Sequence, residues 1–238
     1  MDTHFLWVEG PLSQFEAKCL LSFAAQGYRP ILWAYGPLRN VPQGIQVRDG
    51  REVLPDSAIF TAAGGMAAFS NIFRYAALGK FGGLWADTDV IALKPASLLP
   101  RTPFLVTERA QHQQRGVIVN GNLIHHPSPS SGDTIDLALR YSQAFPRHKI
   151  QWGEIGPKLL TALVNLDERH GFQMMAPEFS NPVDWWDTPD AFLRPAVALP
   201  HAHFIHLYNE MWRRKGVDKN SAFPAHTLIG RMFADIGV

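Results

Sequence analysis

The sequence has a single cysteine, a modest share of charged residues and no long apolar run, and each shortage excludes a class of protein. Cys19 is the only cysteine among 238 residues, so no disulfide can form within the chain, and we expect a buried core thiol, which is consistent with a reducing compartment. No apolar stretch approaches the length of a membrane span. The opening segment MDTHFLWVEGPLS carries an acid and a turn where a signal peptide needs a basic start and an apolar run. These features predict a soluble, cytoplasmic protein.

Neither positive nor negative charge is in excess. Lys and Arg number 22 and Asp and Glu 21, giving a formal net charge of +1, and no basic stripe indicates a nucleic-acid partner. Charged residues make up 18% and hydrophobic residues 46%, which is enough to build a core. The P-loop pattern, the Gly-x-Ser-x-Gly elbow, the Gly-x-Gly-x-x-Gly fingerprint and the HExxH zinc motif are all missing.

The first thirty-odd residues predict a parallel strand–helix–strand unit. His4–Val8 is a short apolar run that ends in a Gly-Pro turn, and Ile31–Ala34 is a second such run. Between them Ser13 and Glu16 form a capping-box pattern at a helix start, and Gly27 marks its end. A helix that joins two strands in this way is typical of a parallel sheet.

The segment Thr61–Gly79 reads as a strongly apolar helix in which Arg74 is the only charged residue. A covered guanidinium needs an anionic partner, because an unpaired buried charge is costly. Asn71 lies three residues earlier, on the same side of the helix. Further strands are expected at 84–93, 104–107 and 116–124, and further helices at 134–145, 157–165 and 225–236.

Asp87-Thr88-Asp89 is the strongest chemical signal. It lies in the apolar run Leu84–Leu93, which we interpret as one strand, so that both carboxylates point to the same face. Two carboxylates near the carboxyl end of a strand make a hard-oxygen site suited to Mg²⁺ or Mn²⁺. A divalent ion bound there could stabilise the charge that develops on a diphosphate leaving group. The alternative is that a bare Asp-x-Asp is a turn or helix-cap feature.

The stretch Ser70–Pro95 resembles the signature of the glycosyltransferases whose sugar-binding region contains a DXD motif, a group that includes glycosyltransferase family 32 and the large clostridial toxin transferase domains. The matching residues are Ser70, Arg74, Tyr75, Gly82, Gly83, Trp85, Asp87 and Asp89. Asn71 departs from the family's usual Asp, which contacts the donor sugar, so the identity of the donor is in question.

Other segments extend the resemblance over most of the chain. The implied donor-binding residues are Trp7, Asn71, Arg74, Tyr75, Asp87, Asn122 and Gly156, with Trp7 against the nucleotide base. The implied metal ligands are Asp87, Asp89, His206 and Asn209, and the implied catalytic residues are Asp87, Asp89 and Arg74. Trp7 could instead be a core residue, and Arg74 could pair with a structural carboxylate.

The resemblance implies an α/β fold of the GT-A type, a Rossmann-like nucleotide-diphospho-sugar transferase sandwich with a mostly parallel central sheet, formed by residues 1–238 as a single domain. It implies metal-dependent sugar transfer, with Mn²⁺ or Mg²⁺, from a UDP-sugar to a hydroxyl of a glycan or glycolipid, with retention of configuration. Bacterial polysaccharide biosynthesis, in the cytoplasm or peripheral to the inner membrane face, is the expected setting.

Two alternatives share the same site. A nucleotide-sugar hydrolase would use the metal without an acceptor, and a non-catalytic nucleotide-sugar-binding protein would hold the donor without turnover. His201 and His203 stand near His206, but without a zinc motif we expect them to be surface or core residues. Trp185 and Trp186 could form a platform for the acceptor, although core packing is the ordinary role of such a pair.

Overall fold

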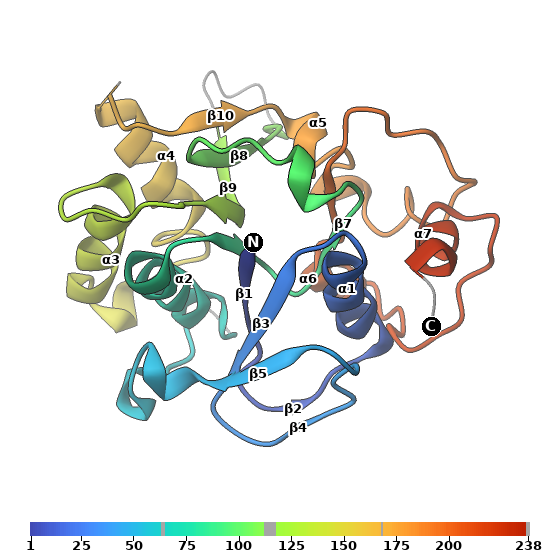
Figure 1. Cartoon of the computed structure of the whole chain (residues 1–238), viewed down its shortest axis with the longest axis horizontal. Coiled ribbons are helices and arrows are strands. Elements are labelled where there is room, and N and C mark those ends of the chain that lie inside the picture. The colour runs from blue at the N-terminus through green and yellow to red at the C-terminus, as the bar shows by residue number, and fades with distance from the viewer. Residues whose placement is uncertain (63–64, 112–117, 168, 237–238) are drawn as a thin grey trace.

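A seven-stranded sheet forms the centre of the protein in a computed structural model that describes residues 1–62, 65–111, 118–167 and 169–236 (Figure 1). The strand order is β10-β8-β9-β6-β1-β3-β5, and four of its six neighbouring pairs are parallel. β9 is the exception, since it runs antiparallel to both β6 and β8. The predicted α/β class with a mostly parallel central sheet is therefore confirmed. The strands are β1 Asp2–Leu6, β3 Arg29–Ala34, β5 Gln46–Asp49, β6 Leu84–Ala86, β8 Phe104–Glu108, β9 Ile118–His125 and β10 Gln173–Met175.

The predicted strand–helix–strand unit at the N-terminus is present. α1 spans Gln14–Ala25 and joins β1 to β3, which pair in parallel. The Ser13 side chain accepts a hydrogen bond at the helix start while Glu16 accepts from the Ser13 backbone, which completes the capping box. Gly27 has a φ of 78° just after the helix, a conformation that glycine adopts without strain.

Helices cover both faces of the sheet, which is the sandwich arrangement that the sequence predicts. α2 (Ala67–Phe81), α3 (Thr134–Ala144) and α4 (Pro157–Leu166) share one hydrophobic core with one face. On the other face α1 packs with a small antiparallel ribbon of β7 (Val90–Ala92) and β11 (Phe204–His206). Figure 1 shows α2, α3 and α4 on one side of the strands and α1 on the other. Cys19 is fully buried in α1, as expected.

The apolar helix lies later in the chain than predicted. α2 begins at Ala67 instead of Thr61, and it continues through Gly79 to Phe81. Gly82, with a φ of 65°, ends the helix in place of Gly79. Helical hydrogen bonding tolerates a glycine within a helix, whereas the left-handed backbone at Gly82 requires one. The predicted segment also includes residues 63–64, which lie outside the described residues.

The prediction of one continuous strand at 84–93 is wrong. Ala86 ends β6, Asp87 to Asp89 form a turn in which the Val90 N–H donates to the Asp87 carbonyl (3.1 Å), and β7 then leaves the main sheet to pair with β11. The two carboxylates are thus brought together by a turn and not by the alternation of a strand. Apolar residues on both sides of the turn are buried in two different sheets, which is why the run looks continuous in the sequence.

The other predicted helices and strands agree with the structure to within a few residues. The largest difference is at the last helix, α7, which begins at Leu228 instead of Ala225. Residues 116–117 of the predicted strand at 116–124 lie outside the described residues. The segment 174–206, which the sequence left unassigned, contains β11, part of β10 and the short helix α5 (Pro177–Ser180). Among the described residues no helix is long and apolar enough to span a bilayer. Other elements are β2 (Gly10–Pro11), β4 (Leu38–Arg39), α6 (Asn209–Arg214), and 3-10 turns at Gly50–Glu52, Asp56–Ala58, Ala96–Leu98, Arg147–Lys149 and Trp185–Asp187.

Candidate active site

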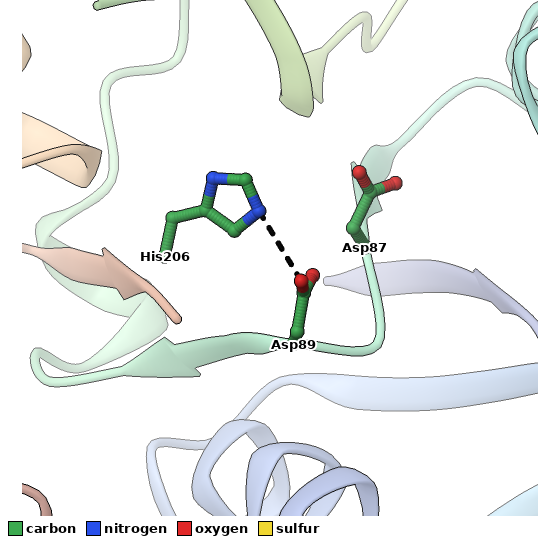
Figure 2. A group of neighbouring side chains, drawn as sticks. All are labelled: Asp87, Asp89 and His206. Atoms are coloured by element: carbon green, nitrogen blue, oxygen red, sulfur yellow. Dashed lines mark ion pairs between the residues drawn. The ribbon is translucent and has the colours of Figure 1, made fainter. Parts of the chain in front are cut away.

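Asp87, Asp89 and His206 converge where β6 ends (Figure 2). The turn after β6 supplies the two aspartates, and the last residue of β11 supplies the histidine. One ligand atom from each residue lies within 4.8 Å of the other two. The antiparallel pairing of β11 with β7 places His206 opposite Val90, so segments more than a hundred residues apart in the sequence meet at this point.

Asp87 is held by neighbours from the DXD segment itself. Its Oδ1 accepts hydrogen bonds from the Arg74 guanidinium (2.7 Å) and the Trp85 indole N–H (2.8 Å). Arg74 is only 5% exposed, so this contact is the anionic partner that the sequence predicts for it. Burial raises the pKa of the Asp87 carboxyl, and the charge of Asp89 adds to that effect while Arg74 opposes it.

Asp89 is held by the C-terminal part of the chain. Its Oδ2 lies 3.4 Å from the His206 Nε2 and accepts the backbone N–H of Asn209 at 2.8 Å. Burial alone would raise the pKa of Asp89, but His206 and these hydrogen bonds bring it below the ordinary value. Burial likewise lowers the pKa of His206, and the carboxylate of Asp89 more than offsets this, so the net shift is upward.

Two glycines leave space for the polar side chains of α2. A Cβ at Gly121 would clash with the Arg74 guanidinium, and a Cβ at Gly156 would lie 2.7 Å from the Asn71 amide nitrogen. Larger residues at either position would displace a side chain that faces the site. Gly156 was predicted as a donor-binding residue. In the structure it packs against the Asn71 side-chain amide, and it is not among the residues that line the cavity described below.

A cavity of ≈ 1080 Å³ opens beside this cluster. Seven of the predicted site residues line it, namely Trp7, Asn71, Arg74, Asp87, Asp89, His206 and Asn209. Clefts of this size with a few converging polar groups are typical of small-molecule sites. Of the two candidate acceptor tryptophans, Trp185 lines the cavity wall and Trp186 does not.

Tyr75 and Asn122 do not reach the cavity wall. Tyr75 is fully buried, and its hydroxyl donates to the Ile155 carbonyl at 3.1 Å. Asn122 is also fully buried, where its amide donates to Ser180 and Asn181 (3.2 Å each). Asn120, two residues earlier in β9, is the asparagine of this strand that lines the cavity, whereas Asn122 is covered by its contacts with Ser180 and Asn181.

Sequence reasoning missed three polar residues of the cavity wall. Glu108 ends β8, accepts the Asn120 side-chain amide at 2.6 Å, and has its pKa raised by burial. Tyr208 has a left-handed backbone (φ 53°), and the centroid of its ring lies 3.9 Å from that of His206. Asn120 lies two residues before Asn122, the asparagine that the family resemblance implies as a donor-binding residue. Only the Asn-Gly-Asn pattern at 120–122 and the position of Tyr208 two residues after His206 gave any signal in the sequence.

The donor set of the cluster fits a divalent cation. Two carboxylates this close repel each other unless a positive charge lies between or beside them, and carboxylate oxygens with one imidazole suit Mn²⁺ or Mg²⁺. The His206 Nδ1 is buried and has no hydrogen-bond partner among residues 1–62, 65–111, 118–167 and 169–236. Asn209, predicted as a further ligand, donates its backbone N–H to Asp89 and its side-chain N–H to Glu16, and its Oδ1 is buried with no hydrogen-bond partner among the described residues.

The protein is therefore an α/β protein with a carboxylate–histidine cluster at the carboxyl end of the central strand β6, facing a large cavity. Residues 56–105 match the family described as "Glycosyltransferase sugar-binding region containing DXD motif". This match covers α2, β6 and both aspartates, and it confirms the resemblance found in the sequence.

A human protein, alpha-1,4-N-acetylglucosaminyltransferase, is 29% identical over 99 residues, which are 41% of this chain and 25% of that relative. Among solved structures, PaToxG glycosyltransferase has 17% identity and a TM-score of 0.49, covering 71% of this chain and 72% of its own. The glycosyltransferase GlyE of Streptococcus pneumoniae TIGR4 has 12% identity and a TM-score of 0.49, covering 98% of this chain and 63% of its own.

Proposed function

We propose that the protein is a glycosyltransferase that moves a sugar from a nucleoside-diphosphate sugar, a UDP-sugar in the first instance, to a hydroxyl of a glycan or glycolipid. The observation that carries the proposal is the cluster of Asp87, Asp89 and His206 in the wall of the large cavity, within and beside the segment that matches the DXD family. The proposal treats residues 1–238 as one catalytic domain of the GT-A type.

Asp87, Asp89 and His206 would hold Mn²⁺ or Mg²⁺, which offsets the negative charge of a diphosphate when bound. Arg74 has a further role in this proposal. Its guanidinium already fixes Asp87, and its Nε is buried in the same cavity wall with no hydrogen-bond partner in the part of the chain that the structure describes. We assign it to orient the aspartate and to attract the diphosphate.

The remaining donor contacts follow from the cavity wall. Trp7 would stack against the base, and Asn71 and Asn120 would orient the sugar. No described residue donates a hydrogen bond to the other carboxylate oxygen of Glu108, Oε1, so this oxygen would accept a hydroxyl of the sugar. Burial weakens competition from water for each of these contacts.

In the transfer step the acceptor oxygen forms a bond to the anomeric carbon, and the bond from that carbon to the phosphate oxygen breaks. The electron pair of the broken bond stays on the nucleoside diphosphate, and the acceptor hydroxyl proton goes to the departing phosphate oxygen. We infer retention of configuration from the resemblance in the sequence. The product is a glycan or glycolipid of the kind made in bacterial polysaccharide biosynthesis, and the proposed setting is the cytoplasm or the inner membrane face.

The test is release of nucleoside diphosphate from a panel of nucleotide sugars with Mn²⁺, in the presence and absence of simple glycosides. We expect release that depends on one donor, and an Asp89→Asn variant at least about a hundredfold slower, the loss typical of removing a catalytic electrostatic group. Asp133→Asn is the matched control, since Asp133 caps α3 and does not line the cavity.

Acceptor dependence distinguishes the alternatives. Fast release without any glycoside would indicate a hydrolase, and tight donor binding with no release would indicate a binding protein. Equal release by the parent and Asp89→Asn would refute the assigned site.

A further inference from the structure

Trp152 presents an exposed indole on the wall of the cavity that holds the aspartate–histidine cluster. Its exposed fraction is 57%, whereas the other six tryptophans are buried or half-buried. A large exposed apolar side chain inside a concave site is a usual mark of a binding surface. No role proposed above for donor or metal uses this residue.

The backbone holds Trp152 in place without burying it. Ile150 and Ile155 on either side are both anchored in the core. Gly153 has a φ of 75°, and its carbonyl accepts the Lys158 N–H of α4 at 3.1 Å. The backbone that carries the indole is therefore braced, so little backbone conformational entropy is lost when a ligand stacks on it.

Helix α6 links Trp152 to the cluster. At its first residue the Asn209 N–H donates to Asp89, and at its last residue the Arg214 guanidinium carbon lies 5.9 Å from the centre of the Trp152 ring. Six helical residues span about 9 Å at 1.5 Å per residue. The residues that contact Asp89 and Trp152 thus lie at opposite ends of this short helix.

The charges on this part of the rim are already paired. Glu210 accepts hydrogen bonds from Arg213 (2.7 Å) and Arg214 (2.9 Å), and these contacts lower the pKa of Glu210 to about 2. The Arg214 guanidinium approaches one face of the Trp152 ring, and the exposed remainder of the indole takes no part in these ion pairs. A flat aromatic face suits the apolar C–H face of an uncharged sugar ring better than it suits a charged group.

We infer that Trp152 is the stacking platform for a pyranose ring of the acceptor, in the wall of the same cavity as the aspartate–histidine cluster. This inference rests on the proposed function and adds the place and chemistry of the acceptor site. It also replaces the Trp185–Trp186 pair as the expected platform, because that pair is half-buried and only Trp185 reaches the cavity.

The experiment measures binding of a panel of methyl α- and β-hexopyranosides by saturation-transfer NMR to the full chain with Mg²⁺ and UDP. We expect at least one glycoside to bind the parent, and its Kd to rise on the order of tenfold in Trp152→Ala, the range expected for a lost aromatic contact. Trp152→Phe should keep most of the affinity. Tyr141→Ala removes another half-exposed aromatic outside the cavity and should bind like the parent.

The UDP signal in each variant reports that the donor side is intact. Binding of no glycoside to the parent, or equal binding by Trp152→Ala, would overturn the inference. The separate release assay without glycoside tests the transferase itself. Glycoside binding that depends on Trp152, together with no diphosphate release from any donor, would refute the transferase and retain the carbohydrate platform.

Discussion

The two aspartates of the site differ in which region of the protein holds them. Asp87 is bonded by Arg74 and Trp85, both within the matched segment, and Arg74 carries a permanent charge. Asp89 is bonded by His206 and the Asn209 backbone, which lie more than a hundred residues later. One carboxylate therefore has a fixed cation beside it in every state, while the other depends on a titratable imidazole and on correct docking of the C-terminal segment.

The two regions therefore contribute different parts of the site. Helix α2 and strand β6 position Asp87 and form its first half, and β11 with α6 positions Asp89 and forms its second half. Changes in the first half should destabilise the fold as well as the site, and changes in the second half should act more on the site.

The largest effect is expected from Arg74→Met. Loss of the guanidinium leaves Asp87 in a half-buried position beside Asp89 without a compensating charge, and we expect a loss of about 3 kcal/mol in the free energy of unfolding. Urea denaturation measures this value. A second change, Asp87→Asn in the same chain, should restore part of it, and no recovery would show that the ion pair is not the source.

A smaller loss is expected from Gly121→Ala, because the new methyl group would occupy the position of the Arg74 guanidinium. Overpacking of this kind costs roughly 1–3 kcal/mol. Gly79→Ala is the matched control, since Gly79 lies within α2 with open space around it and alanine favours a helix by about 1 kcal/mol. The midpoint temperature of thermal unfolding should fall in Gly121→Ala and rise in Gly79→Ala. A shift in the same direction in both variants would contradict the packing argument.

His206→Ala should cost less in stability, about 1 kcal/mol, because Asp89 keeps the Asn209 N–H. The effect on the site should be larger than the effect on the fold, with Mn²⁺ affinity lower by about 10–100-fold, the range seen when metal-site partners are removed. Calorimetric titration of Mn²⁺ beside urea denaturation separates the two. A large loss of stability without a change in Mn²⁺ affinity would show that His206 supports the fold and not the metal site.

The smallest effect is expected far from the cavity, at the cap of α3. Burial would raise the pKa of Asp133, but the N–H groups of Asp136 and Ser130 outweigh it and the pKa is lowered. A carboxyl with a depressed folded pKa stabilises above its unfolded value of about 3.9 and loses this contribution as the pH falls through the folded pKa. Asp133→Asn keeps a capping oxygen but loses the charge at the helix start, so it should cost roughly 0.3–1 kcal/mol at neutral pH and progressively less in acid. A cost independent of pH would contradict this.

Much of the first half-site could be predicted from the sequence, because its signals are local. An isolated Arg74 in an apolar helix demands an anion, and the Gly-Gly turn followed by Asp-Thr-Asp identifies where that anion lies. The capping box at Ser13 and Glu16 was equally local. In each case residues within about twenty positions of one another determine the arrangement.

The second half could be predicted only in part, because it depends on long-range pairing. His206 was selected by resemblance, but nothing in the sequence fixes the pairing of β11 with β7 that brings it to Asp89. That Asn120 lines the cavity could not be predicted for a related reason, since the residues that cover Asn122, Ser180 and Asn181, lie 58 and 59 positions later in the sequence. Glu108 lies at a strand end with no motif around it.

The measurement that tests the central claim most directly is the titration of Mn²⁺ in the presence of UDP, followed by electron paramagnetic resonance, for the parent, Asp89→Asn and Asp133→Asn. The account predicts tight binding by the parent and Asp133→Asn and at least about a hundredfold weaker binding by Asp89→Asn, since that variant loses a charged ligand. Equal Mn²⁺ affinity in all three proteins would contradict the assignment of the metal site.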